Sequence, residues 1–266
     1  MKIGVIGVGI ITTNIIEGFL GFGKSPHEFF LSPRNRERSM ALAEKYPENV
    51  TRCEANQEVL DKSDFVFLGL LPEKAEGILK ELRFRRNHRV IGLIPIIGLP
   101  KLREIIGETD ILCDVVPLPF ISRRIGPIVC YPPEREVMEL LAPMGKVVPV
   151  NSEKEISVLR TSTSLMSPYY ELIYTVVSWC VENDLNEEAA KAYITAFFEG
   201  LSKMAAAAPL GGLDELAHEM TPGGLNYQSL NYLTERDAFS PWKETLAPVL
   251  QRVRKSSSQP ETEQKK

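Results

Sequence analysis

Residue types that build metal centres and disulfide frameworks are scarce in this sequence. The 266 residues include three histidines and four cysteines, which are scattered along the chain: His27, His88 and His218, and Cys53, Cys113, Cys130 and Cys180. None of them has the spacing of a ligand pair, so we expect no metal site. The cysteines are typical of buried free thiols in a reducing compartment.

Long apolar runs and an excess of basic charge are lacking as well. No stretch approaches the roughly 20 apolar residues that span a bilayer, so we expect no membrane segment. The first residues read directly as a strand rather than as a leader peptide, which favours a cytoplasmic protein. The formal net charge of -4 leaves no basic stripe for nucleic acid. A small molecule is therefore the expected partner.

A glycine turn near the start of the chain is the strongest motif. It lies between an apolar stretch typical of a buried parallel strand and an isoleucine-rich stretch that predicts a helix. Gly7 permits a tight turn, and Gly9 lets the backbone approach a pyrophosphate. The first N–H groups of the helix, at Ile10 and Ile11, then face the anion. This order predicts a dinucleotide site, although an ordinary strand–helix turn has the same spacing.

The third glycine of this fingerprint is absent, because Thr12 stands in its place. In the three-glycine form, the last glycine lets the helix pack closely against the strand. We therefore expect the helix to lie slightly further from the strand here.

The segment after the second expected strand, Glu28–Leu31, indicates which dinucleotide binds. A fold that prefers NAD has an acidic residue near this point, which binds the ribose 2′-hydroxyl. Here Ser32, Arg34 and Asn35 offer a hydroxyl, a guanidinium and an amide, which suit a 2′-phosphate. The pattern favours NADP(H) over NAD; the alternative is a helix cap followed by a solvated basic turn.

Strands and helices alternate through residues 1–151, which predicts an α/β domain with a doubly wound parallel sheet and right-handed crossovers. Ligands collect at the carboxyl ends of such strands, which here include residues 70–72 and 94–96. The apolar connection 116–126 contains Arg123 and Arg124. They are either anion contacts or the exposed arginines of a rigid connector.

The pattern changes at residue 152, where the strand signals stop. Residues 152–255 predict an all-helical domain whose last helix covers Pro241–Lys255. Its long helices are too apolar for a single exposed layer, so we expect a homodimer or a higher homo-oligomer built through this domain. Residues 256–266 contain no apolar side chain and predict a disordered tail.

Motifs along most of the chain, to about residue 255, belong together. They are the Gly4–Gly9 turn, Ser32-x-Arg34-Asn35, Asn56-x-Glu58, Phe67–Pro72, Met144–Val148 and Met220–Gly224. Together they resemble pyrroline-5-carboxylate reductase, the NADPH-dependent enzyme of the last step in proline biosynthesis.

The resemblance implies a Rossmann-type domain followed by a helical domain that interleaves with a partner subunit. The implied cofactor contacts are the glycine turn, Ser32, Arg34, Asn35, Asn56, Leu70, Leu71 and Pro72. The nicotinamide would lie near residues 70–72 and 94–96, with the substrate between that ring and the helical domain. The candidate substrate contacts are Pro117, Arg123, Met166, Gly223 and Gly224.

The substrate half departs from the family pattern. Leu71 stands where the family commonly has a lysine, and Asn226 where it has a threonine that helps to hold the substrate. Leu165 and Ser167 replace the two glycines of the element Ser-Gly-Ser-Gly-Pro-Ala-Tyr. Glycines in a carboxylate-binding turn offer backbone N–H groups without an obstructing side chain, so this pocket is narrowed. We expect a changed substrate or lost catalysis.

These observations predict an oxidoreductase that transfers hydride from NADPH to a C=N bond of a small cyclic imine or, as a second choice, to a C=O bond. Asn226, Ser167, Tyr169 and Tyr170 are the expected donors to the developing amine. Each has a structural alternative, Asn226 as a helix N-cap and the tyrosines as core aromatics. The second hypothesis, which the departures favour, is a non-catalytic NADP-binding dimer that acts through a partner protein.

Overall fold

The computed structural model describes residues 1–258 of the chain. These residues divide into two compact units. The first contains residues 1–161 and the described residues from Leu250 on, and the second contains residues 162–249. Residues 259–266, which belong to the segment expected to be a disordered tail, lie outside the described residues.

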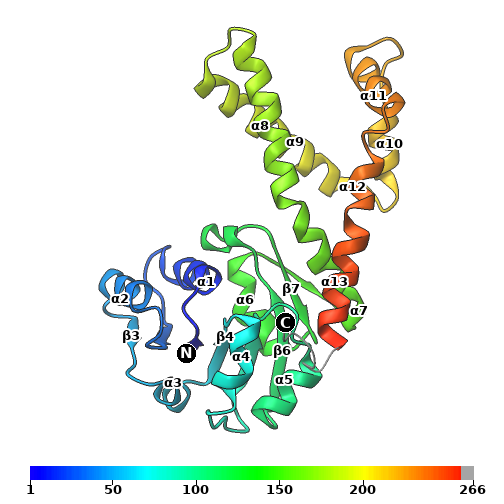
Figure 1. The fold of residues 1–266 in the computed structure, drawn as a ribbon. Coiled ribbons are helices and arrows are strands. Elements are labelled where there is room, and N and C mark those ends of the chain that lie inside the picture. The colour runs from blue at the N-terminus through cyan, green and yellow to red at the C-terminus, as the bar shows by residue number, and fades with distance from the viewer. Residues whose placement is uncertain (259–266) are drawn as a thin grey trace, which may run out of the picture. The chain divides into compact units, whose positions relative to one another are not determined.

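The first unit is built on an eight-stranded sheet with the order β3-β2-β1-β4-β5-β6-β7-β8 (Figure 1). Its strands are β1 (Lys2–Ile6), β2 (Glu28–Leu31), β3 (Val50–Arg52), β4 (Phe65–Leu68), β5 (Arg89–Gly92), β6 (Ile111–Val116), β7 (Pro127–Tyr131) and β8 (Lys146–Pro149). Strands β1 to β6 are parallel. The predicted doubly wound α/β sheet is confirmed.

At the far edge the sheet departs from the parallel arrangement expected from the sequence. Strand β7 is antiparallel to β6, and β8 is parallel to β7. The connection from β6 to β7 holds only the 3-10 helix η1 (Pro119–Arg123). A parallel crossover needs a dozen or more residues, usually with a helix, so the shorter chain turns back beside β6.

Helices cover both faces of this sheet. One face is covered by α1 (Ile10–Leu20), α2 (Arg36–Lys45), α6 (Arg135–Leu141) and the 3-10 helix η2 (Ala142–Met144), and the other by α3 (Asn56–Lys62), α4 (Pro72–Leu79) and α5 (Leu99–Ile106). Along β4, Phe65 and Phe67 pack in the first core, and Val66 and Leu68 pack in the second. Burial on both faces explains why these strands are continuous apolar runs.

Helix α7 (Glu153–Ser162) follows the sheet and is tied to it by a buried ion pair. Arg160 Nη2 donates to Asp114 Oδ1 on β6 at 2.7 Å, and both side chains are largely buried. Burial raises the pKa of the Asp114 carboxyl, while the charge of Arg160 acts in the opposite direction. The pair therefore fixes α7 against the middle of a strand.

The second unit is entirely helical. Its elements are η3 (Thr163–Leu165), α8 (Met166–Glu182), α9 (Glu187–Ala207), α10 (Gly212–His218), α11 (Leu225–Glu235), α12 (Ser240–Glu244) and the first turn of α13 (Leu246–Ser258). The single helix expected over Pro241–Lys255 is divided at Thr245. Pro248 explains the division, because in a continuous helix its ring would clash with the carbonyl of Glu244. Helix α13 reaches three residues into the segment expected to be disordered.

Residues 1–258 contain no membrane-spanning helix, no three-residue metal cluster and no disulfide bond. No helix in this part of the chain is long and apolar enough to cross a membrane. No group of three His, Cys, Asp or Glu side chains within it could hold a metal ion. The four cysteines are free; Cys53, Cys113 and Cys130 are buried, as the sequence predicts, and Cys180 is half-buried.

Candidate functional site

A cleft of about 1100 Å³ runs across the carboxyl ends of β2, β1, β4 and β5 in the first unit. Its volume lies slightly above the usual range for small-molecule sites, about 300–1,000 Å³. The lining residues are Gly7–Thr12, Arg34, Asn35, Arg38, Gly69–Leu71, Glu73, Lys74, Gly77, Ile78, Glu81, Leu93 and Pro95. The site therefore lies at the sheet edge where ligands collect in doubly wound folds.

The glycine turn forms the middle of the cleft. Gly7 has φ 95°, which few side chains tolerate, and an added Cβ would lie 2.5 Å from the Gly69 carbonyl oxygen. At Gly9 an added Cβ would meet nothing within 4 Å, so this side of the turn is open. The first intrahelical bond of α1 runs from the Thr13 N–H to the Gly9 carbonyl, which leaves the N–H groups of Ile10 and Ile11 without intrahelical acceptors.

Three polar side chains form hydrogen bonds with the backbone of the turn. Ser32 Oγ accepts from the Gly7 N–H at 3.0 Å, and Asn35 Nδ2 donates to the Val8 carbonyl at 2.9 Å. The Thr12 hydroxyl accepts from the Gly9 N–H at 2.9 Å and donates to the Gly7 carbonyl at 3.0 Å. Each of residues 7–9 thus has at least one backbone group bonded to a side chain.

The methyl group of Thr12 fits because Gly69 faces it at the end of β4. An added Cβ at Gly69 would lie 2.4 Å from Thr12 Cγ2. The residue that replaces the third glycine is therefore accommodated by a glycine on the neighbouring strand. Thr12 itself is 2 % exposed.

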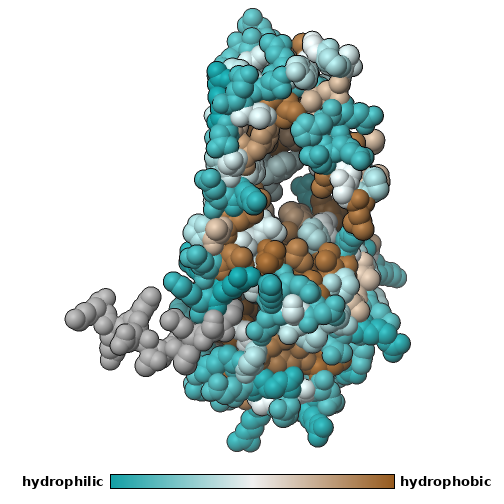
Figure 2. All heavy atoms as spheres, turned by 90° about the vertical axis from the view of Figure 1, so that its right-hand side faces the viewer, coloured by the Kyte–Doolittle hydropathy of each residue, from teal (hydrophilic) through white to brown (hydrophobic). Residues whose placement is uncertain are grey.

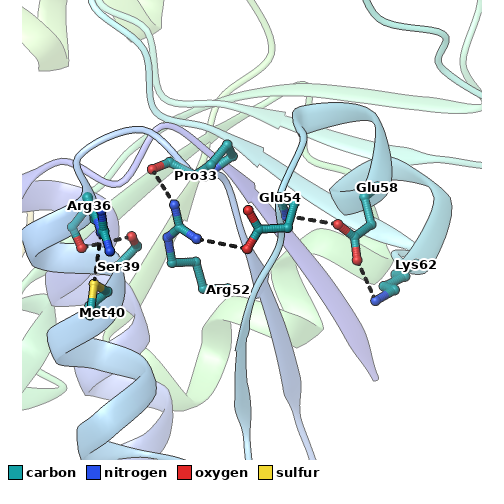
Figure 3. A network of polar contacts seen from close by, with 8 residues as sticks. All are labelled: Pro33, Arg36, Ser39, Met40, Arg52, Glu54, Glu58 and Lys62. Carbon is teal, nitrogen blue, oxygen red and sulfur yellow. Dashed lines mark hydrogen bonds and ion pairs between the residues drawn. The ribbon is translucent and has the colours of Figure 1, made fainter.

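Two arginines line the β2 end of the cleft, and a third, between them in sequence, does not. Arg34 and Arg38 are lining residues, and neither forms an ion pair within residues 1–258. Arg36 instead directs Nε to Met40 Sδ on its own helix at 3.4 Å (Figure 3). The cleft thus has two uncompensated cations at this end, where an anionic group would be stabilised.

The loop that carries Arg34 is held by a side chain from β3. Arg52 donates to the Pro33 carbonyl at 3.3 Å and to Glu54 at 3.1 Å (Figure 3). The chain of contacts continues through Glu58, which accepts from the Glu54 N–H and from Lys62 and whose pKa is lowered chiefly by the Lys62 hydrogen bond. The network fixes the backbone next to the arginines rather than binding a ligand itself.

The strand ends at β4 and β5 give the opposite end of the cleft four apolar residues, while Glu73, Lys74 and Glu81 line the cleft from the segment after β4. The apolar residues are Leu70, Leu71, Leu93 and Pro95. Leu71 is 58 % exposed, a large exposure for an aliphatic side chain in a concave site. The cleft therefore changes along its length from basic at β2, through the turn at β1, to apolar at β5.

Most of the cofactor residues predicted from the sequence line this cleft: Gly7, Gly9, Ile10, Ile11, Arg34, Asn35, Leu70 and Leu71. Three do not. Ser32 is 1 % exposed, Asn56 is the first residue of α3, and Pro72 is the first residue of α4. Asn56 Oδ1 is buried and has no hydrogen-bond partner within residues 1–258.

Pro95, within the predicted range 94–96, also lines the cleft, whereas Arg38, Gly69 and Lys74 line it without having been predicted as contacts. Arg38 could have been predicted to lie near Arg34, because it follows Arg34 by four residues and the start of α2 lies between them. The others depend on how close α4 and the end of β4 come to the turn, which only the fold determines.

The expected contacts after β6 do not line the cleft. Pro117 is buried and Arg123 is exposed. Arg124 donates from Nε to the Gly18 carbonyl at 2.8 Å, and its guanidinium lies 4.4 Å from the centre of the Phe22 ring. Arg124 thus fastens η1 to the last turn of α1, where a cation also complements the helix dipole.

The remaining predicted residues belong to the second unit. Met166, Ser167 and Tyr169 lie in the first turn of α8, and Tyr169 contacts the ring of Phe198 on α9 at 6.2 Å between centroids. Gly223 and Gly224 precede α11, whose N-cap is Gly224, so Asn226 is not the cap. Their roles in catalysis and substrate binding stay predictions.

Comparisons with known proteins agree with this architecture. Residues 2–94 match a family model described as NADP oxidoreductase, coenzyme F420-dependent. No curated protein sequence matches the chain.

Solved structures match along nearly the whole chain. A pyrroline-5-carboxylate reductase from Streptococcus pyogenes is 23% identical, with a TM-score of 0.81 over 96% of this chain and 98% of its own. The NADP-bound pyrroline carboxylate reductase of Plasmodium falciparum is 17% identical, with a TM-score of 0.81 over 97% and 98%. A reductive aminase from Aspergillus terreus, in complex with NADPH, is 14% identical, with a TM-score of 0.56 over 96% and 93%. At these identities the matches show the fold.

Proposed function

We propose that the protein is an oxidoreductase that binds NADP(H) in this cleft and transfers hydride to the C=N bond of a small cyclic imine. The observation that carries the proposal is the order of chemistry along the cleft: two unpaired arginines, then open backbone N–H groups, then an apolar pocket. The match of residues 2–94 to an NADP oxidoreductase family supports it. Structural neighbours that are a reductase and a reductive aminase support the reaction class.

The residues of the cleft fit a phosphorylated dinucleotide. Arg34 and Arg38 would hold the 2′-phosphate, because guanidinium groups bind phosphate oxygens with paired, charge-assisted hydrogen bonds. Ile10 and Ile11 would offer their N–H groups to the pyrophosphate at the positive end of α1. The open side of Gly9 leaves room for the phosphate to approach the backbone.

The apolar end of the cleft suits a nicotinamide ring, and the bound cofactor supplies the hydride there. Leu71, Leu93 and Pro95 would exclude water from one side of the ring. A developing amine then needs a hydrogen-bond or proton donor. Asn226, Ser167 and Tyr169 are the donors that we propose, with Tyr169 exposed enough, at 41 %, to present its hydroxyl.

We further propose that the second unit forms a homodimer. Within residues 162–249, only Ala190, Ile194 and Gly212 are buried, so the unit has almost no core of its own. Large apolar side chains are exposed instead, and apolar surface of this unit is visible in brown in Figure 2. Examples are Met204 (63 %), Leu201 (49 %) and Phe197 (48 %). A second copy of the chain would cover such faces by isologous pairing. A monomeric mass in light scattering at micromolar protein concentration contradicts the proposed homodimer.

The cofactor assignment is tested by calorimetric titration of NADPH and NADH. Arg34→Ala should weaken NADPH binding by about 1–3 kcal/mol, the contribution of a charge-assisted hydrogen bond, and leave NADH binding unchanged. Arg36→Ala is the matched control, because that side chain is turned toward Met40. Equal affinity of the wild type for the two dinucleotides contradicts the assignment.

A further inference from the structure

We infer that Thr12, Ser32 and Asn35 are positioning residues, which lock the glycine turn in the shape that presents the first N–H groups of α1 to the pyrophosphate. The inference rests on the proposed function. It assigns two polar residues, which the sequence places at the 2′-phosphate, to a different part of the cofactor. It also gives a function to the residue that replaces the third glycine.

The hydrogen bonds divide the backbone groups of the turn into two sets. The Gly7 N–H, the Gly7 carbonyl, the Val8 carbonyl and the Gly9 N–H are all bonded to the three side chains, at 2.9–3.0 Å. The first-turn N–H groups of α1 remain for an anion. The Gly9 N–H, which a glycine fingerprint would also offer to phosphate, is therefore occupied by Thr12 in this chain.

Burial makes these contacts consequential. Thr12 and Ser32 are 2 % and 1 % exposed, so water does not replace a hydroxyl that is removed. The backbone N–H or carbonyl that was bonded to it is then unpaired and shielded from water. The free-energy cost of such a group exceeds the net contribution of the hydrogen bond. The turn can recover that loss only by changing shape, and such a change moves the N–H groups that follow it.

Asn35 contributes through its own backbone as well. It has φ 56°, in the left-handed region where asparagine is enriched among non-glycine residues. It lies next to Arg34 in the loop after β2. One loop thus contributes both a lock for the turn and the cation for the 2′-phosphate.

This division of roles predicts two distinct binding phenotypes. The pyrophosphate is common to NADPH and NADH, so a loosened turn weakens both dinucleotides by the same factor. The 2′-phosphate is present only in NADPH, so the loss of Arg38 weakens that dinucleotide alone. The ratio of the two dissociation constants therefore distinguishes a lock from a phosphate ligand.

The test measures dissociation constants for NADPH and NADH by calorimetry on the full-length protein. Thr12→Val and Ser32→Ala should each weaken both dinucleotides about tenfold, with an unchanged ratio between them. Thr12→Ser, which keeps the hydroxyl, should restore affinity to within about threefold of the wild type. Arg38→Ala should weaken NADPH about tenfold and leave NADH unchanged.

Thr13→Val is the matched control. The Thr13 hydroxyl is next in sequence, is buried and has no partner within residues 1–258, so its loss should leave both constants unchanged. Circular dichroism establishes that each variant is folded. If Thr12→Val does not fold, Ser32→Ala carries the same test.

Wild-type affinity in Thr12→Val and Ser32→Ala overturns the inference. A selective loss of NADPH binding in Ser32→Ala also overturns it, because that result makes Ser32 a ligand of the 2′-phosphate. Failure of the proposed function has a different signature, since the wild type then binds neither dinucleotide.

Discussion

Gly69→Ala, combined with Thr12→Ser, tests how this chain accommodates the residue that replaces the third glycine. An alanine Cβ at position 69 would lie 2.4 Å from Thr12 Cγ2 and 2.9 Å from the Gly7 carbonyl oxygen. Overpacking of this kind costs about 1–3 kcal/mol. The smaller conformational entropy of unfolded alanine returns about 0.4–1 kcal/mol. We therefore expect Gly69→Ala to lower the free energy of unfolding by about 1–2 kcal/mol.

Thr12→Ser removes the methyl group and keeps the hydroxyl that bonds the turn. Alone, it should cost about 1 kcal/mol, the value of one buried methyl group. Together with Gly69→Ala, it removes the closer of the two clashes. The double variant should then be more stable than the sum of the single effects by at least about 0.5 kcal/mol, as expected of residues in contact.

Urea unfolding, followed by far-ultraviolet circular dichroism, gives the four free energies of this cycle. Effects that add to within about 0.3 kcal/mol contradict a contact between these two residues. Additivity would mean that the Thr12 methyl group does not occupy the space beside Gly69.

Three further predictions concern stability. Burial lowers the pKa of His88 in the folded protein, whereas a histidine in the unfolded chain keeps a pKa of about 6.5. Below that pH the unfolded chain therefore binds more protons than the folded protein, and the melting temperature should fall as the pH drops. The fall should be smaller in His88→Gln. Ile96 has φ 80° in a turn position that favours glycine, so Ile96→Gly should leave thermal stability equal or higher. Ile97→Gly, which removes a partly buried side chain packed against the core, should instead cost about 1–3 kcal/mol. Arg160→Met leaves Asp114 buried without its partner and should cost about 3–5 kcal/mol in urea unfolding at neutral pH.

The sequence predicts those features whose signals are local. Strand Glu28–Leu31 has its predicted bounds, because its apolar pattern and the flanking turn residues both lie within a few positions. The divided helix near the C-terminus was also predictable. Pro248 disfavours a continuous helix, because its ring clashes with the carbonyl four residues earlier.

Features that depend on distant partners could not be read from the sequence. Ser32 contacts a backbone N–H 25 residues away, and Arg124 contacts a carbonyl 106 residues away. A polar residue after β2 has the same local pattern whether it binds a phosphate or locks a turn. The residues of β7 do not show whether the strand runs parallel or antiparallel to β6. Its direction depends on the short, proline-rich connection that precedes it.

Steady-state loss of NADPH absorbance measures the proposed hydride transfer from NADPH to a cyclic imine. The assay compares pyrroline-5-carboxylate with a panel of other cyclic imines and keto acids. We expect weak or no turnover of pyrroline-5-carboxylate, because Leu165 and Ser167 add volume to the turn that would hold its carboxylate. We expect turnover of at least one other imine. If the protein binds NADPH but oxidises it with none of these compounds, the proposed reaction is wrong. That result favours a non-catalytic binding protein.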